Sequence, residues 1–270
     1  MLSEVQKRLL DMLQWFHQYC VNNNFRYYII AGTMLGAIRH KVFMPWDDDI
    51  DVVLPRPDYD RLIQTFNNRE EQYFLESPYT GNSDYCYSFA KLYDTRTTLT
   101  ERTRRNCRRG LYVDVFPLDG VGTDIEEARR NFRKVDRMNM FLMTRTCPIT
   151  KERKLYKNIV IFASQLIPSF IVNDQRLIKK LDHTAASVDY DSSHYVGSLM
   201  AGYREKEIME KRIYGKPTEY LFENIVVYGV EHYEEYLTHI YGDWRKLLPV
   251  EKRKTTHQYI ELDLEKPYLQ

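Results

Sequence analysis

The chain has 270 residues, of which 43% are hydrophobic and 29% charged, and its formal net charge is +1. This composition excludes long disordered segments, collagen-like repeats and a disulfide-dense miniprotein. The near-neutral charge argues against binding to nucleic acid over the whole surface, so we expect no nucleic acid partner. The four cysteines form no CxxC pair and the charged N-terminus lacks a signal-peptide core, which together predict the cytoplasm as the compartment.

The first 120 residues alternate between helical and extended patterns. Ser3 is expected to cap a first helix that runs to about Val21, because apolar residues recur in it at three- and four-residue steps. The elements expected after it are a strand at 27–31, a turn at Gly32, a helix at 34–39, a strand at 50–54, a helix at 58–66, and strands at 85–92, 97–100 and 111–116.

The rest of the chain reads as mainly helical. The expected elements are helices at 124–144, 151–166, 175–187 and 233–241 and a short edge strand at 195–200. The fold class predicted is therefore α/β (α+β). A boundary near 120–123 would divide a catalytic core at 1–122 from a helical region at 123–270 that completes the core and forms the acceptor side; one continuous domain is the alternative.

The longest apolar run, residues 159–172, is shorter than the ~20 residues that a membrane-spanning helix needs. We interpret it as a buried core helix that ends near Pro168. The alternative is a monotopic patch on a membrane surface. In that case the basic residues just upstream, Lys151, Arg153, Lys154 and Lys157, would meet anionic lipid headgroups.

Four aspartates lie within five positions directly before an apolar strand: Asp47, Asp48, Asp49 and Asp51. Like charges repel, so such a cluster needs a compensating cation unless water solvates it. On a strand, Asp49 and Asp51 would point to the same face, where they can hold one or two hard divalent cations. The alternative is a solvated acidic turn.

Two further features favour a ligand site over a solvated turn. Gly32 and Thr33 follow the preceding strand, where a glycine lets a ligand approach the backbone and the start of a helix offers N–H groups to phosphate. Asp114 is a lone carboxylate in an apolar strand, and burial of an unpaired carboxylate is costly. If its strand lies beside 50–54, Asp114 can join the same metals; otherwise it is a structural aspartate bonded to the backbone.

These residues together resemble the LicD family of phosphocholine transferases, whose wider group includes the fukutin-type phosphotransferases. GTMLGAIRHKVFMPWDDDIDVVLPRPDYDRL resembles the central motif of the family, and FAKLYDTRTTLTE, GLYVDVFPLDGV and YGDWRKLLPVEKRKTTH are similar to its later blocks, in the same order. The resemblance implies a nucleotidyltransferase-type fold, a mixed sheet with flanking helices. In that pattern Gly32 and Thr33 form the turn, Asp49 and Asp51 the acidic pair, and Asp114 the third acid.

The family resemblance implies transfer of phosphocholine from CDP-choline to a hydroxyl of a cell-surface glycan, such as teichoic acid or lipopolysaccharide, with release of CMP. Asp49, Asp51 and Asp114 would be catalytic and would hold Mg²⁺ or Mn²⁺, with two ions expected, to brace the diphosphate. Asp114 is also the candidate general base. A lipid-linked acceptor would bring the protein into peripheral contact with the inner face of the cytoplasmic membrane.

Basic residues are expected to meet the donor phosphates. The candidates are Arg39, His40, Lys41, Lys91, Arg96 and His257, each with an ordinary surface charge or a structural histidine as the alternative. Five arginines within 102–109 predict a basic loop that attracts an anionic acceptor, or else a solvated loop. Trp46 is a candidate for stacking on the base or on choline.

Three other functions stay open from the sequence. A related transferase would use another CDP-activated donor such as CDP-ribitol, and a nucleotidyltransferase would add NMP to a small acceptor. The carboxylates do not separate these enzymes, because the metal chemistry is the same in all of them. A binding protein with an inactive fold is the third reading, and the intact acids Asp49, Asp51 and Asp114 argue against it.

Overall fold

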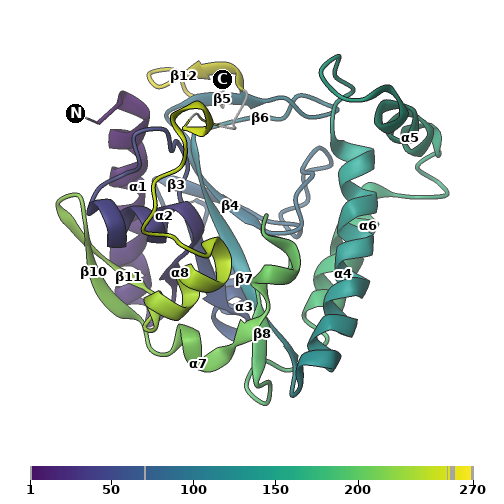
Figure 1. The fold of residues 1–270 in the computed structure, drawn as a ribbon. Helices are drawn as coiled ribbons and strands as arrows, with labels where there is room; N and C mark the ends of the chain where they lie inside the picture. Colours follow the sequence, from purple (N-terminus) through teal and green to yellow (C-terminus); the bar gives the residue numbers. More distant parts are fainter. Residues whose placement is uncertain (1, 70, 254, 256–258, 269–270) are drawn as a thin grey trace.

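The computed structural model describes residues 2–69, 71–253, 255 and 259–268. A mixed sheet forms its centre, and its main path runs β10-β11-β1-β2-β7-β4-β3, with β8 added to β7 and β9 to β8 (Figure 1). The bounds are β1 Tyr28–Ile29, β2 Asp51–Pro55, β3 Tyr73–Glu76, β4 Ala90–Asp94, β7 Tyr112–Gly122, β8 Tyr195–Gly197, β9 Met209–Glu210, β10 Thr218–Phe222 and β11 Ile225–Gly229. A smaller sheet holds β5 (Thr98–Glu101), β6 (Arg108–Arg109) and β12 (Tyr259–Asp263).

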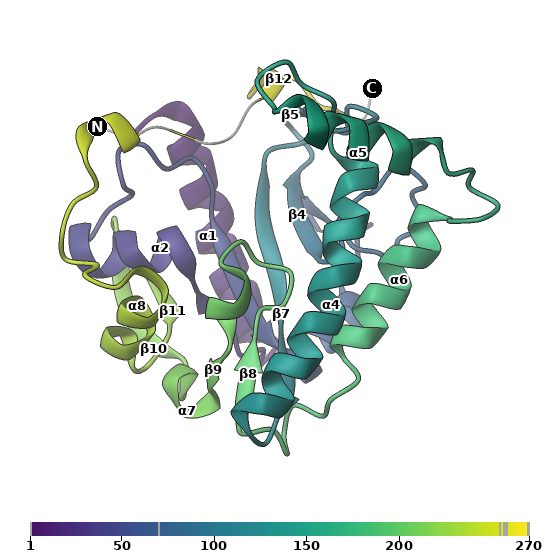
Figure 2. The same cartoon turned by 45° about the vertical axis from the view of Figure 1, so that its right-hand side comes forward.

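Helices cover the sheet and extend beyond one edge of it. They are α1 Glu4–Asn22, α2 Ala31–Leu35, α3 Arg56–Thr65, α4 Ile125–Thr146, α5 Leu155–Leu166, α6 Asp174–Ala185, α7 Lys211–Tyr214 and α8 Tyr233–Tyr241, with a π-helical turn η1 at Gly36–His40 and 3₁₀ turns η2 at Arg204–Glu207 and η3 at Val250–Lys252. Helices α1 and α3 pack on the sheet, α4 packs against β7 and α6, and α5 packs on α4 (Figure 2).

Local sequence signals explain several helix boundaries. A capping box starts α1. The side chain of Ser3 accepts a hydrogen bond from the backbone N–H of Gln6, and the side chain of Gln6 accepts one from the backbone N–H of Ser3. Asp124 caps α4 by accepting from the backbone N–H of Glu127 at 2.8 Å. Two helices thus begin where a side chain satisfies an otherwise unpaired N–H group.

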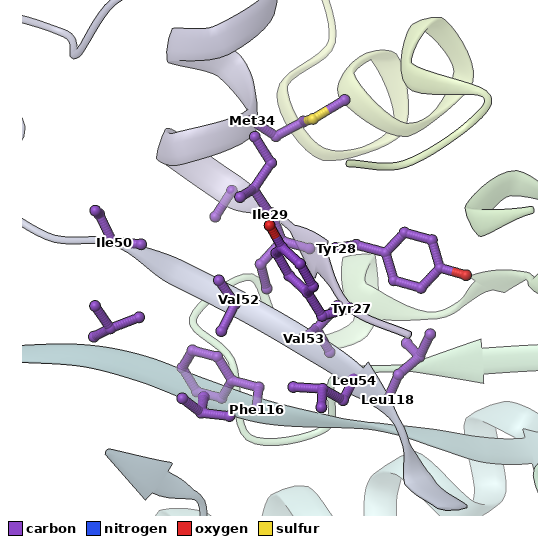
Figure 3. Close-up of a cluster of buried hydrophobic side chains, with 14 of the residues drawn as sticks. Tyr27, Tyr28, Ile29, Met34, Ile50, Val52, Val53, Leu54, Phe116 and Leu118 are labelled. Carbon is purple, nitrogen blue, oxygen red and sulfur yellow. The ribbon is translucent and has the colours of Figure 1, made fainter. Parts of the chain in front are cut away.

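The core lies where β1, β2 and β7 meet the helices. Figure 3 shows side chains of these strands packed together, among them Ile29, Val52, Val53 and Phe116. All four are buried, and successive residues of β2 point to opposite faces of the sheet. Because the strand is apolar on both faces, it fits only in the middle of a covered sheet. The aspartates at the start of β2 are therefore held at one end of a central, rigid strand.

The predicted fold class is confirmed, since a mixed central sheet with flanking helices is followed by a part dominated by α4, α5, α6 and α8. The hairpin β10–β11 joins the sheet through β1, so residues after 122 also complete the central layer. The domain boundary at 122 itself stays a prediction. Helix α8 has the bounds that the sequence predicts.

Several expected bounds were wrong. The strand expected at 85–92 begins only at Ala90, because residues before it are loop, and the helix expected from 151 begins at Leu155. The edge strand expected at 195–200 is only Tyr195–Gly197.

The interpretation of residues 159–172 as a buried core helix was also wrong. Most of its apolar side chains are exposed, because α5 packs on α4 with only a narrow face.

Candidate active site

A cavity of about 570 Å³ opens where β2 begins. Its walls come from three distant parts of the chain: the segment 30–51, the segment 201–207 and the segment 241–248, with Phe116 of β7 between them. Cavities of this size bind small-molecule substrates and cofactors. The residues on its walls that carry chemistry are Arg39, Asp47, Asp49, Asp51, Tyr203, Glu207, Tyr241, Asp243, Trp244 and Lys246.

The acidic pair and the third acid are brought to one place. Asp51 is the first residue of β2, and its register partner on the parallel strand β7 is Asp114. Because paired residues of neighbouring parallel strands point to the same face, the two carboxylates share one side of the sheet. Asp49 was expected on the strand but precedes it, and it lines the cavity together with Asp51.

The electrostatics of Asp51 show how crowded this site is. Burial raises the pKa of Asp51 well above its ordinary value, and repulsion from Asp49, Asp114 and Asp47 raises it further. The protein's own cations therefore do not fully compensate the charged form of Asp51. A site of this kind is a candidate for function, because structural carboxylates are normally paired.

The side chain of Lys91 is the counter-ion of Asp114. Its ammonium nitrogen lies 2.8 Å from Oδ1 of Asp114 and 3.7 Å from Oε1 of Glu101, and it sits 3.3 Å from the centre of the Tyr112 ring. Lys91 is only 2% exposed and is not on the cavity wall. Burial raises the pKa of Asp114 to about 6, with the Lys91 charge acting against that rise. The donor contact expected for Lys91 stays a prediction, and its present role is to neutralise Asp114.

The carboxylates fit a divalent cation by their chemistry. In the described part of the chain, no three Asp, Glu, His or Cys side chains come close enough together to form a ready-made metal site. Even so, Asp49 and Asp51 both line the cavity, and Asp114 pairs with Asp51 across the neighbouring strands. Hard cations such as Mg²⁺ and Mn²⁺ prefer carboxylate oxygens as ligands, with water and phosphate completing the coordination shell. The raised pKa values of Asp51 and Asp114 point to the same need for positive charge.

Gly32 and Thr33 connect the first helix after β1 to the acidic strand. They belong to α2, which begins at Ala31, and not to a turn before a helix as expected. The Oγ1 atom of Thr33 accepts from the backbone N–H of Asp51 at 3.1 Å, which fixes the helix to the strand. A Cβ atom on Gly32 would come within 2.6 Å of Oδ2 of Asp47, so a larger residue here would displace this carboxylate.

Of the expected basic residues, Arg39 reaches the cavity. Its guanidinium donates to the carbonyl oxygens of Trp244 at 2.6 Å and Lys246 at 3.3 Å, which joins the segment after α2 to the segment after α8. His40 is half-buried beside Arg39, and burial together with the Arg39 charge lowers its pKa. Arg39 is thus the basic residue of the predicted set that the structure places on the wall, as far as the described residues go.

The remaining expected basic residues lie elsewhere. Lys41 is exposed, with a left-handed backbone at φ 63° after η1, and Arg96 donates to both carboxylate oxygens of Asp94, at 2.8 and 2.9 Å. His257 lies outside the described residues. Trp46 is half-buried, with the guanidinium of Arg253 5.5 Å from its ring centre. Their substrate contacts therefore stay predictions.

The sequence analysis missed the far wall of the cavity. Glu207 is 2% exposed and accepts from the backbone N–H of Tyr203 at 3.3 Å, and burial raises its pKa to about 8. The hydroxyl of Tyr203 donates to that of Tyr241 at 2.8 Å. The sequence does carry one signal for this wall, the block YGDW, because its residues Tyr241, Asp243 and Trp244 line the cavity.

A mixed sheet with two acids at the start of a central strand and a third acid on the parallel neighbour agrees with the nucleotidyltransferase-type pattern that the sequence motifs imply. Residues 24–142 match the family model described as LicD/FKTN/FKRP, nucleotidyltransferase domain. The chain therefore contains a LicD family domain at residues 24–142, as its sequence motifs predict.

Two curated relatives show how far the similarity extends. The chain is 29% identical over 262 residues to the lipopolysaccharide cholinephosphotransferase LicD of Haemophilus influenzae, an alignment that covers 95% of this chain and 96% of that protein. It is 28% identical over 127 residues to the mannosyltransferase regulator 4 of Saccharomyces cerevisiae, which covers 43% of this chain and 10% of that protein. The first similarity includes the late segments that close the cavity, and not only the family domain.

Proposed function

We propose that this protein is a phosphotransferase that moves phosphocholine from CDP-choline to a hydroxyl of a glycan and releases CMP. The observation that carries the proposal is the convergence of Asp49, Asp51 and Asp114 at one end of β2 and β7. It is supported by similarity along nearly the whole chain to a cholinephosphotransferase that acts on lipopolysaccharide. The transferred group, the donor and the acceptor are all parts of this proposal.

In the proposed reaction, the acceptor oxygen forms a bond to the phosphorus that carries choline. The bond from that phosphorus to the bridging oxygen breaks, CMP leaves with the electron pair, and the acceptor hydroxyl loses its proton. Divalent cations, Mg²⁺ or Mn²⁺, would neutralise the negative charge that builds up on the diphosphate when they are bound. Asp49, Asp51 and Asp114 are the residues that would hold them, with two ions proposed.

Asp114 is the proposed carboxylate nearest the acceptor hydroxyl. Its pKa is raised to about 6, so at neutral pH it is largely ionised and can accept a proton. Lys91 at 2.8 Å keeps that carboxylate charged in a buried place. Arg39, held by the carbonyl oxygens of Trp244 and Lys246, is the proposed cationic contact for the nucleotide phosphate on the opposite wall.

The test is release of CMP from CDP-choline in Mg²⁺, with lipopolysaccharide or teichoic acid as the acceptor. CDP-ribitol and ATP are assayed in parallel, since another CDP-activated donor or NMP transfer is the competing function. We expect turnover with CDP-choline, loss of it in Asp51→Asn, and normal turnover in Asp11→Asn, which makes the same chemical change on an exposed face of α1. Preference for CDP-ribitol, or pyrophosphate release from ATP, would replace the proposal with that alternative.

A further inference from the structure

The surface of α5 and the turn after it carries an unusual concentration of exposed apolar side chains. Leu155, Ile159, Phe162 and Leu166 recur at three- and four-residue steps and form one stripe of the helix, and all are exposed. Phe170, in the turn, is 86% exposed. Single exposed apolar residues are ordinary, but a contiguous group marks a surface that binds something.

Contacts from α4 hold this apolar surface in place. Arg145 of α4 is 2% exposed and pairs with Asp174. Its guanidinium also donates to the carbonyl oxygens of Ser164 at 2.6 Å and Val172 at 3.1 Å. A buried cation therefore donates to carbonyl groups at the end of α5 and of the turn, and so ties both to α4. The exposure of Phe170 is thus part of a built structure and not of a frayed helix end.

Basic residues lie near both ends of the apolar stripe. Between 151 and 172 the chain has four basic residues, Lys151, Arg153, Lys154 and Lys157, and one acid, Glu152. The loop at 102–109 lies against the same place, because Arg104 donates from its backbone to Thr146 O at 2.7 Å and from its side chain to Gln165 O at 3.1 Å. Arg102, Arg104 and Lys151 line a shared groove of about 600 Å³.

An apolar stripe with basic residues near both ends complements an anionic lipid surface, in which acyl chains lie beneath phosphate headgroups. Helix α5 has 12 residues, so it is about 18 Å long and does not reach across a hydrocarbon core of about 30 Å. In the part of the chain that the structure describes, no helix is long and apolar enough to span a membrane. The helix can lie along a bilayer, but it cannot cross one.

We propose that α5, the turn at 167–172 and the loop at 102–106 form a docking surface for an anionic lipid bilayer. The apolar stripe enters the boundary between headgroups and acyl chains, and Lys151, Lys154, Lys157 and Arg104 contact the headgroup phosphates. The views in Figures 1 and 2 both draw α5 on the opposite side of the molecule from α2 and α8. None of the residues named here lines the catalytic cavity, so the proposal is independent of the proposed reaction.

Co-sedimentation with vesicles tests the docking surface. We expect the protein to bind vesicles of equimolar phosphatidylglycerol and phosphatidylcholine, and to bind pure phosphatidylcholine vesicles much more weakly. Phe162→Asp with Phe170→Asp should lower binding to the anionic vesicles at least about tenfold, because it removes the apolar insertion. Lys154→Gln with Lys157→Gln should weaken binding and reduce its sensitivity to salt.

Leu221→Asp is the matched control, because Leu221 is also an exposed apolar residue, at 54%, but lies on β10 away from α5. It should bind vesicles as the unmodified protein does. Thermal unfolding of each variant by circular dichroism should match the unmodified protein, since the substituted side chains are exposed.

Absence of binding to anionic vesicles, or equal binding by all variants, would overturn the proposal. So would a concentration-dependent dimer that Phe162→Asp with Phe170→Asp abolishes while the unmodified protein ignores vesicles, because the stripe would then pair with a second copy.

Discussion

The ammonium nitrogen of Lys91 lies 2.8 Å from a carboxylate oxygen of Asp114, and both groups are held on neighbouring strands of the central sheet. The register pairs Lys91 of β4 directly with Asp114 of β7. The third acid of the proposed metal site is thus neutralised by a lysine that the same sheet supplies. This arrangement lets a carboxylate remain charged in a buried place before any ligand arrives.

Removal of the Lys91 side chain should therefore destabilise the fold. We expect Lys91→Met to lower the free energy of unfolding at pH 7 by about 3 kcal/mol, because Asp114 and Glu101 would be left without their buried counter-ion. Urea denaturation measures the change. Lys7→Met, which removes a lysine from an exposed pair with Glu4, should change stability by less than about 0.5 kcal/mol. Similar effects of the two substitutions would contradict this account.

Asp51 is expected to oppose folding in the absence of metal. Its pKa is raised by burial and by three neighbouring acids, so its ionised form costs stability above the pKa of the unfolded chain and this cost disappears at lower pH. Asp51→Asn in EDTA should raise the free energy of unfolding at pH 7 by about 1–3 kcal/mol. Mg²⁺ should raise the melting temperature of the unmodified protein but not of Asp51→Asn. If Mg²⁺ does not stabilise the unmodified protein, the metal proposal is wrong.

The buried carboxyl group of Glu207 should make the stability of the protein depend on pH. Burial raises its pKa from the ordinary 4.5 to about 8, so its contribution to stability is full below pH 4.5 and is lost as the pH rises towards 8. Glu207→Gln should exceed the unmodified protein in unfolding free energy by roughly 3 kcal/mol at pH 7, and by several-fold less at pH 5. Denaturation at both pH values checks this in EDTA. The exposed Glu219→Gln should show no such trend.

The cavity also predicts opposite outcomes for two of its glycines. A methyl group on Gly32 would collide with Asp47, whereas one on Gly202 meets nothing within 4 Å. Gly32→Ala should lower kcat/KM for the CDP-choline reaction at least about tenfold, because a displaced carboxylate spoils the geometry of the site. Gly202→Ala should leave the rate within about twofold. Equal losses in both variants would show that added bulk anywhere in the cavity is harmful.

The near wall of the site could be predicted because it is local in sequence. Gly32, Asp49 and Asp51 lie within twenty residues, and the apolar pattern after them already indicates a buried strand. For the far wall the sequence offers only the block YGDW, because Glu207 and Trp244 reach the cavity through pairing and packing of distant segments. No local sequence pattern indicates that these segments meet in the folded protein.

Two structural features had no clear sequence signal. The turn of the β10–β11 hairpin places Glu223 at φ 55°, a conformation for which glycine or asparagine would have been the usual marker. The apolar run in α5 predicts burial, but apolar periodicity does not say whether protein or another medium covers it. The apolar pattern therefore predicts a helix here, but not the medium that covers it.

The parallel pairing of β1 with β11, with Ile29 opposite Gly229, has a consequence for biosynthesis. The two strands are two hundred residues apart in the chain, and the cavity wall extends to Leu248. During translation, a ribosome exposes the acidic strand long before it releases the segments that enclose it. The nascent chain thus exposes the acidic strand until the segment up to Leu248 has left the ribosome, and only then can the substrate chamber form.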